Sequence, residues 1–455
     1  MKILKNVSLR IPYKNLELPA LYFLLLFESG AWYHHIQPIA YELNDNLILP
    51  PDPLRRLVTM LAYTSIFLLF LFKWKKVISI ILKDKLLVLL IGLVCLSVLW
   101  SASPTSTLDN IKALMRSTLL GIYLVSLFSL ESILTLLKKI ALLSAVLSII
   151  YFLLYPNDAV MAGLQIDQGL RGIFFHKNRL ADMMSIGILA CIYSSPDRQT
   201  EKLYPSEEFK ENKNSPSSQK LRKAIPILIL STVLIMSNGR TPQIAILLAL
   251  TVPMLLREAL GFRYRLRTFI LVSSTLFLFF TVIFIYSYLP EILISFGKDP
   301  TFTGRTDVWP MALERIFSRF FLGYGYQAYW PAYGNDFKAE FTLNNPMSAW
   351  TPGHAHSGFL ELMLGLGMIG FTLFLVHLLK SLFRSLVLFQ SEFKWTWNLQ
   401  LLIFFVIQNL TAGIIPAPGI VWITYVISTS SLAYKTIKKE DKLAFNTLEN
   451  QELYS

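Results

Sequence analysis

Apolar runs long enough to cross a bilayer recur along the whole chain, and they restrict it to one class of fold. A helix needs roughly 17 or more apolar residues to span the hydrocarbon core. Of the 455 residues, 54% are hydrophobic and 16% are charged, and the mean hydropathy is +0.51. Little sequence is left for a soluble domain. We therefore predict an all-α, polytopic membrane protein in which residues 1–455 form a single integral membrane domain.

The runs predict about 12 transmembrane helices. They lie at residues 19–35, 57–73, 85–100, 110–129, 140–155, 179–195, 224–238, 241–257, 268–289, 356–378, 396–414 and 419–434. Basic residues near span ends stay on the cytoplasmic side, and here they gather in alternate loops, which places both termini inside. The predicted cytoplasmic segments include a flexible loop at 196–223 and a tail at 436–455. The net charge of +13 then suits anionic lipid and requires no nucleic acid.

A long predicted outer loop at 290–355 separates spans nine and ten. It holds Trp309, Trp330 and Trp350 among glycines, prolines and further aromatic residues. A loop of this length and composition is typical of a folded, functional cap on the membrane surface. Within it, we predict a helix from Thr306, whose residues at helical spacing form one apolar face: Val308, Met311, Ala312 and Ile316.

Two arginines on the predicted outer side share a Gly-Arg-Thr context. Arg305 stands at the predicted helix start, where guanidinium and free N–H groups together favour an anion. Arg240 stands in the turn between spans seven and eight. The competing interpretations are an ion pair between Arg305 and Asp307 and snorkelling of Arg240 toward lipid phosphate. The repeated context favours bidentate capture of one phosphate-containing ligand.

Further cations stand at the outer entrance of span six, in the stretch QGLRGIFFHKNRLADMM. Arg171 and Lys177 are the candidate ligand-binding residues there. A cationic belt at the membrane interface is the simpler alternative, and contact with a lipid diphosphate competes with it.

Two of the six histidines, His354 and His356, stand at the mouth of span ten, in TPGHAHSGFLELMLGLGMIG. A lone histidine in a membrane protein is usually a hydrogen-bonded structural residue. Imidazole is also the side chain best suited to accept a proton near neutral pH. A pair of imidazoles on the same predicted side as the arginines favours acid–base chemistry. A direct pairing with Glu361 is not assured, since the two positions point about 140 degrees apart on a continuous helix.

The spacing of His356-Ser357, nine residues, Gly367, two residues and Gly370 resembles the motif of the O-antigen ligase and polymerase superfamily. The stretches GRTDVW, LGYGYQAYW and GHAHSGFLELMLGLGMIG are similar to its succinoglycan-type exopolysaccharide polymerase branch. LWSASPTSTL and GIFFHKN also resemble stretches of that branch. The specific motifs lie mainly between residues 171 and 370.

The resemblance implies a metal-independent glycosyltransferase of the GT-C fold class in the bacterial cytoplasmic membrane, with its active site on the extracytoplasmic face and no cofactor. Its donor would be a glycan linked to undecaprenyl diphosphate, and its acceptor a glycan hydroxyl. His356 matches the catalytic base, and Arg240 and Arg305 match the two essential arginines. Arg171, Lys177 and His354 are further substrate-binding candidates.

Three functions follow from these expectations. A polymerase would use a second lipid-linked repeat unit as acceptor, and a chain-length regulator would be a candidate partner. A ligase would use a lipid A core or a protein hydroxyl. A flippase would only transport the glycan, but it would need charged residues along a transmembrane path and, in many transporter folds, an internal repeat that this sequence lacks. The sequences of two motifs, GHAHS and GRTDVW, favour the polymerase.

Overall fold

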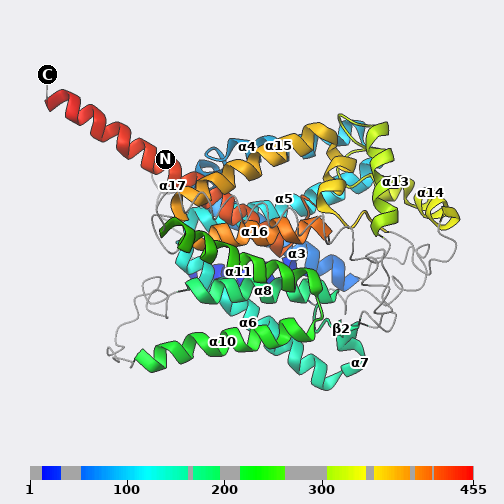
Figure 1. Ribbon diagram of the computed structural model, residues 1–455, viewed down its shortest axis with the longest axis horizontal. Coiled ribbons are helices and arrows are strands. Elements are labelled where there is room, and N and C mark those ends of the chain that lie inside the picture. The colour runs from blue at the N-terminus through cyan, green and yellow to red at the C-terminus, as the bar shows by residue number, and fades with distance from the viewer. Residues whose placement is uncertain are drawn as a thin grey trace, which may run out of the picture. The chain divides into compact units, whose positions relative to one another are not determined.

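A computed structural model describes residues 13–31, 53–161, 168–194, 216–261, 305–344, 353–389, 395–411 and 415–453. The described chain is almost entirely helical (Figure 1). It divides into two compact units. Unit 1 comprises Met1–Ile80, Arg116–Gly239 and Gly419–Ile423. Unit 2 comprises Ile81–Met115, Arg240–Pro418 and Thr424–Ser455. Each unit is therefore assembled from segments that are distant in the sequence.

Unit 1 is a helical bundle with α8 at its centre. Its elements are α1 (Tyr13–Glu28), nearly all of α3 (Pro53–Ile81), the end of α5 (Pro104–Leu127), α6 (Leu130–Leu154), α7 (Pro156–Ala159), α8 (Lys177–Tyr193) and α10 (Pro216–Met236). Helix α8 packs against both α6 and α10, and it is buried on all sides. From Met183 onward the helix carries mostly small and apolar side chains, as expected of a helix that is buried on all sides.

A short antiparallel ribbon joins α7 to the segment before α8 in unit 1. Strand β1 (Val160–Met161) pairs with β2 (Gly169–Leu170) in the register Val160↔Leu170. The backbone N–H groups of Arg171 and Gly172 then donate to the carbonyl of Ala159. The ribbon therefore fixes the chain immediately after it, which carries Arg171.

Unit 2 contains the remaining helices, with α15 in contact with several of them (Figure 1). They are α4 (Lys85–Leu96), the 3₁₀ turn η2 (Ser97–Trp100), the start of α5, α11 (Arg240–Gly261), α13 (Arg305–Ser318), α14 (Tyr329–Asn344), α15 (Gly358–Phe389), α16 (Thr396–Thr411) and most of α17 (Ile420–Leu453). Helix α15 contacts α4, α13 and α16, and α16 packs along α11.

A buried polar chain joins three helices of unit 2. Asp84 caps the N-terminus of α4, and its Oδ2 lies 3.1 Å from Nε2 of His377 on α15. The other ring nitrogen of His377 lies 2.8 Å from the hydroxyl of Tyr425 on α17. All three side chains are buried. A buried polar group is costly unless it is hydrogen-bonded, so this chain fixes the three helices in one register.

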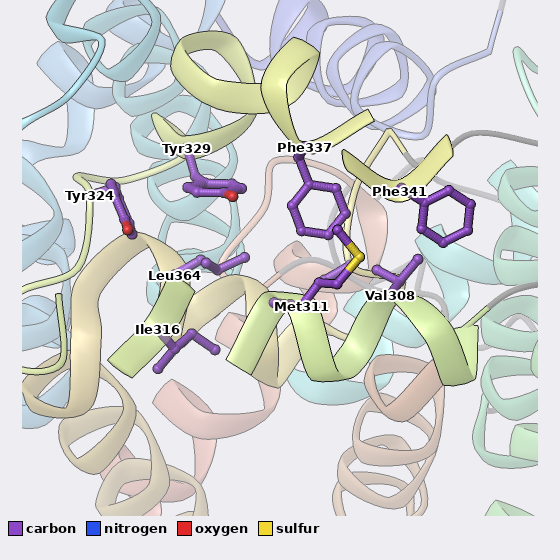
Figure 2. Packing of buried hydrophobic residues seen from close by; sticks show 10 residues of the cluster. Val308, Met311, Ile316, Tyr324, Tyr329, Phe337, Phe341 and Leu364 are labelled. Carbon is purple, nitrogen blue, oxygen red and sulfur yellow. The ribbon is translucent and has the colours of Figure 1, made fainter. Parts of the chain in front are cut away.

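The described part of the segment predicted as an outer loop forms two helices, called the cap here and defined as α13, α14 and the segment between them. All four apolar residues that the sequence places on one face are buried in a single cluster: Val308, Met311, Ala312 and Ile316. In Figure 2, Phe337 and Phe341 reach from α14 toward Met311 and Val308 on α13. The helix predicted from Thr306 is therefore confirmed, together with its buried face.

The cap is fastened to α15 where that helix is broken. Gly367 has φ 63° and ψ −165°, which interrupts the helical hydrogen bonds. The segment between α13 and α14 consists of turns, and it uses the freed backbone groups in four bonds: Tyr324 N to Leu364 O (2.8 Å), Gly325 N to Gly365 O (2.9 Å), Met368 N to Phe320 O (2.8 Å) and Ile369 N to Phe321 O (3.2 Å). A backbone junction of this kind positions the cap on the end of α15.

The same segment is held on its other side by the chain around η2. The indole N–H of Trp100 donates to the carbonyl of Leu322 (2.9 Å), and the N–H of Ala102 donates to the carbonyl of Tyr324 (2.8 Å). A Cβ atom on Gly325 would lie 2.7 Å from the Cα of Ser101, so only glycine fits there. Glycines in LGYGY thus allow close backbone contact.

The all-α membrane fold predicted from the sequence is confirmed at the level of its helices. Within the described ranges, four helices are long and apolar enough to cross a membrane: Arg56–Ile81, Leu130–Leu154, Arg240–Glu258 and Gly358–Phe389. Every predicted span overlaps a described helix except 268–289, which lies outside the described residues. The number of spans and their orientation stay predictions.

Several helices are longer than the apolar runs that predicted them. Helix α6 begins at Leu130 and includes Lys138 and Lys139, which the charge pattern assigned to a loop. Helix α10 begins at Pro216, inside the loop predicted at 196–223, whose residues up to 215 lie outside the described ranges. Helix α17 continues to Leu453 through the predicted tail. Long basic side chains can extend to the interface from within a helix, so hydropathy underestimates helix length.

Candidate active site at the start of α15

The two histidines lie in a short loop directly before α15, and they contact each other. Their ring centroids are 3.7 Å apart with an interplanar angle of 36°. The backbone N–H of His356 donates to Nδ1 of His354 at 3.1 Å. His356 adopts φ +50°, a left-handed conformation that few residues other than glycine take. His354 therefore helps to hold the backbone of His356, whatever else it binds.

Ala355, between the two histidines, is held by side chains from two helices. Its N–H donates to Oε1 of Glu361 on α15 at 2.5 Å, and its carbonyl accepts from the indole N–H of Trp309 on α13 at 3.0 Å. Ala355 is fully buried. Both backbone groups of the residue that separates the imidazoles are thus satisfied by side chains, and the loop is fixed from both directions.

Glu361 is held in turn by the cap. The indole N–H of Trp330 on α14 lies 2.9 and 3.0 Å from the two carboxylate oxygens of Glu361. The Trp330 ring packs edge-on against Tyr329 and Phe337, with centroids 5.2 and 5.1 Å away. Glu361 itself is only 9% exposed. The cap therefore reaches the histidine loop through two indole groups, one from each of its helices.

The centre of the cap holds uncharged tyrosine side chains, and charged arginine side chains lie around them. Burial raises the pKa of Tyr324 and Tyr329, so both phenols stay protonated at neutral pH. Arg319 lies over the Tyr324 ring, 4.7 Å from its centroid, and Arg315 forms an ion pair with Glu340 on α14. These contacts stabilise the packing of α13 against α14 rather than the loop.

Arg305 begins the helix whose next turn contacts the histidine loop. Arg305 is the first residue of α13. Trp309, four residues further along the same helix, donates to Ala355 between the two histidines. The helix that begins at Arg305 thus contacts the histidine loop. The sequence predicted a helix start at this arginine, and α13 begins there.

Arg240 is the first residue of α11, and its side chain is exposed. The preceding turn contains Asn238 with φ +51°, whose amide donates to the carbonyl of Gln168 at 2.9 Å. Arg240 thus emerges from a fixed turn at the N-terminus of a helix, the position at which an anion is best stabilised. Its meeting with His356 and Arg305 in one pocket stays a prediction.

Arg171 and Lys177 belong to unit 1, and both are buried. Arg171 is 9% exposed and donates through Nε to the carbonyl of Asp158 at 2.9 Å. Lys177 is 3% exposed and begins α8, which is capped by Nδ1 of His176 accepting from the N–H of Asn178. Cations of an interfacial belt would face lipid headgroups or water, so burial argues against that simpler alternative. Their binding of substrate stays a prediction.

Sequence reasoning missed the parts played by Glu361, Trp309 and Trp330. It placed His356 inside the tenth span and compared its helical direction with that of Glu361. The helix begins at Gly358, so His356 precedes it and the helical angle does not apply. One signal in the sequence could have found them. Glu361 is a carboxyl group in an otherwise apolar run, and burying such a group is costly unless a specific partner donates a hydrogen bond to it.

Comparison with known proteins identifies the segment that carries this site. Residues 225–375 match the family model of O-antigen ligase. This stretch begins in α10, ends in α15, and contains Arg240, Arg305, Glu361 and both histidines.

One curated relative is the exopolysaccharide production protein ExoQ of Rhizobium meliloti (strain 1021). It is 34% identical to the chain over 104 residues, which cover 22% of this chain and 23% of that protein. The match thus spans about a quarter of the relative's length. Residues 225–375 are therefore similar to O-antigen ligase, and part of the chain is similar to an exopolysaccharide production protein.

Proposed function

We propose that the protein is a membrane glycosyltransferase that polymerises a polysaccharide from repeat units linked to undecaprenyl diphosphate. The observation that carries the proposal is the hydrogen bond from Trp309 to Ala355, because it brings the helix that starts at Arg305 to the loop that presents His356. This contact supports a site in which a phosphate-binding arginine and a proton-accepting imidazole act together, as transfer from a lipid diphosphate requires.

The proposed reaction is a direct displacement. A hydroxyl oxygen of the acceptor sugar attacks the anomeric carbon of the donor, and its proton passes to the imidazole of His356. The bond from the anomeric carbon to the diphosphate oxygen breaks, and the electron pair stays on the diphosphate. Arg240 and Arg305 stabilise that negative charge. A single displacement inverts the anomeric configuration. Twelve spans, cytoplasmic termini and an extracytoplasmic site complete the proposal.

Product length distinguishes this function from its alternatives. Purified protein supplied with lipid-linked repeat units is expected to yield a ladder of lengthening glycans. A ligase would instead shift one lipid A core or protein acceptor by a single step, and a flippase would leave every covalent bond unchanged. Likeness to an exopolysaccharide production protein favours the ladder. A single shifted band with an added core acceptor, and no ladder without it, would replace the polymerase with the ligase.

Removing the charge of either arginine is expected to weaken donor binding. In Arg240→Gln or Arg305→Gln, the loss of one charge-assisted hydrogen bond should cost about 1.5 to 3 kcal/mol, which is about 10- to 150-fold in the donor Kd. The measurement is equilibrium binding of a lipid-linked repeat unit in nanodiscs.

Arg315→Gln is the matched control, because Arg315 lies on the same helix as Arg305 but pairs with Glu340. Its donor Kd should equal that of the wild type. An unchanged donor Kd in Arg305→Gln would favour the alternative in which Arg305 pairs with Asp307. An unchanged donor Kd in Arg240→Gln would favour the alternative in which Arg240 extends toward lipid phosphate.

A further inference from the structure

Glu361 makes more contact with the histidine loop than the start of a helix requires. The residue that caps α15 is Ser357, whose carbonyl accepts from the N–H of Glu361 at 2.9 Å. In an ordinary capping box, an acidic side chain reaches back to the N–H of the cap residue itself. Here the carboxylate reaches two residues further, to Ala355. The Glu361 carboxylate therefore restrains the histidine loop and does not cap the N-terminus of α15.

The loop needs such a restraint because His356 adopts a left-handed backbone conformation. A non-glycine residue keeps a sparsely populated φ only when the surrounding structure fixes it. The restraints on His356 come from both of its preceding neighbours, through Nδ1 of His354 and through the bonded backbone of Ala355. The Glu361 bond joins the loop to α15 and, through Trp330, to α14 of the cap, while the Trp309 bond joins the loop to α13.

We propose that Glu361 is a positioning residue for the catalytic base, held by Trp330 and acting through the backbone of Ala355. This inference rests on the proposed function, since it assumes that His356 accepts the proton of the acceptor hydroxyl. Glu361 takes no proton from substrate. It sets the direction of the imidazole, and a misplacement of about 1 Å in a reacting group can cost about 100-fold in rate.

The test uses four variants of the full chain in nanodiscs: Glu361→Ala, Glu361→Gln, Trp330→Phe and the double variant Glu361→Gln with Trp330→Phe. Glu361→Ala releases Ala355, and kcat should fall about 10- to 100-fold while the donor Kd stays within about twofold. A glutamine can keep one oxygen for the N–H of Ala355, but its NH₂ group then faces the indole N–H of Trp330. Phenylalanine removes that N–H and keeps an aromatic ring.

The comparison that decides is between the kcat of the double variant and the kcat of Glu361→Gln alone. It should have a higher kcat than Glu361→Gln alone, because the clash between two donors is gone while the bond to Ala355 is kept. A carboxylate that only supports folding would give no such rescue, and its loss would lower thermal stability and donor binding together. Glu340→Gln is the matched control, since Glu340 lies on α14 and pairs with Arg315. It should leave kcat unchanged.

Two results would overturn the inference. One is a Glu361→Ala variant with the kcat of the wild type, and the other is a double variant no faster than Glu361→Gln. Where Glu361→Ala does not fold, the comparison of Glu361→Gln with the double variant still decides. Failure of the proposed function has a different signature: the wild type forms no glycosidic product, or His356→Ala remains fully active. In that case the inference fails with it.

Discussion

Replacing His356 with alanine is expected to remove turnover and to leave donor binding intact. The expected fall in kcat is about 10²- to 10⁴-fold, the usual contribution of a positioned general base. Donor affinity should not change, because the arginines proposed to bind the diphosphate lie on α11 and α13. The measurements are single-turnover glycan transfer and equilibrium binding of the donor in the same nanodisc preparation.

The pH dependence of the same variant tests the direction of proton transfer. A base must be neutral to accept a proton, so kcat of the wild type should fall as pH drops through the imidazole range. The residual activity of His356→Ala should lack this acid limb. Added imidazole should restore part of the rate if the side chain acts as a proton acceptor. Full activity without imidazole would exclude His356 as the base.

His354→Ala is the matched control for His356→Ala. The two rings are in contact, but Nδ1 of His354 accepts the backbone N–H of His356. Loss of that hydrogen bond should cost about 0.5 to 1.5 kcal/mol, or about tenfold at most in rate. Equal losses in the two variants would contradict the assignment of the base to His356 alone.

The sequence predicted the helices and several site positions because these depend on local patterns. Apolar runs placed nearly every described helix, and helical spacing placed Val308, Met311, Ala312 and Ile316 on the buried face of α13. The start of α13 at Arg305 also follows from local signals, since the residues after it favour a helix and its proline stands near the first turn.

The arrangement around His356 could not be predicted in this way. It depends on Trp309 and Trp330, which approach the loop only after the cap has folded onto α15. It also depends on the left-handed conformation of His356, and α15 begins at Gly358, two residues later than the apolar pattern indicates. Periodicity describes one helix at a time, whereas this site is made by a loop and three helices.

The break in α15 is a second feature that needs a distant partner. The apolar run at 356–378 predicts one uninterrupted helix across this position. Gly367 interrupts it because the segment at Phe320 to Gly325 supplies backbone donors and acceptors for the freed groups. The resemblance marked Gly367 as part of a motif, and the structure gives its physical reason: it is the junction between α15 and the cap.

Gly367→Ala is therefore expected to destabilise the protein strongly. A Cβ atom there would lie 2.2 Å from the carbonyl oxygen of Phe321 and 2.3 Å from its carbonyl carbon. The values of φ 63° and ψ −165° also belong to a region that is essentially restricted to glycine. Relief of the clash would break the bonds to the cap. We expect a cost of about 3 kcal/mol or more, measured as a lower thermal unfolding midpoint in detergent.

Gly92→Ala provides the comparison, because Gly92 lies within α4 and no atom lies within 4 Å of its added Cβ. Alanine favours a helix by up to about 1 kcal/mol over glycine, so this variant should unfold at the wild-type temperature or slightly above it. Gly367→Ala should also lose turnover, since a displaced cap withdraws Trp309 and Trp330 from the histidine loop. If Gly367→Ala instead matched Gly92→Ala in both stability and turnover, the cap could not be what holds His356 in place, and the histidine loop would have to be fixed by α15 alone.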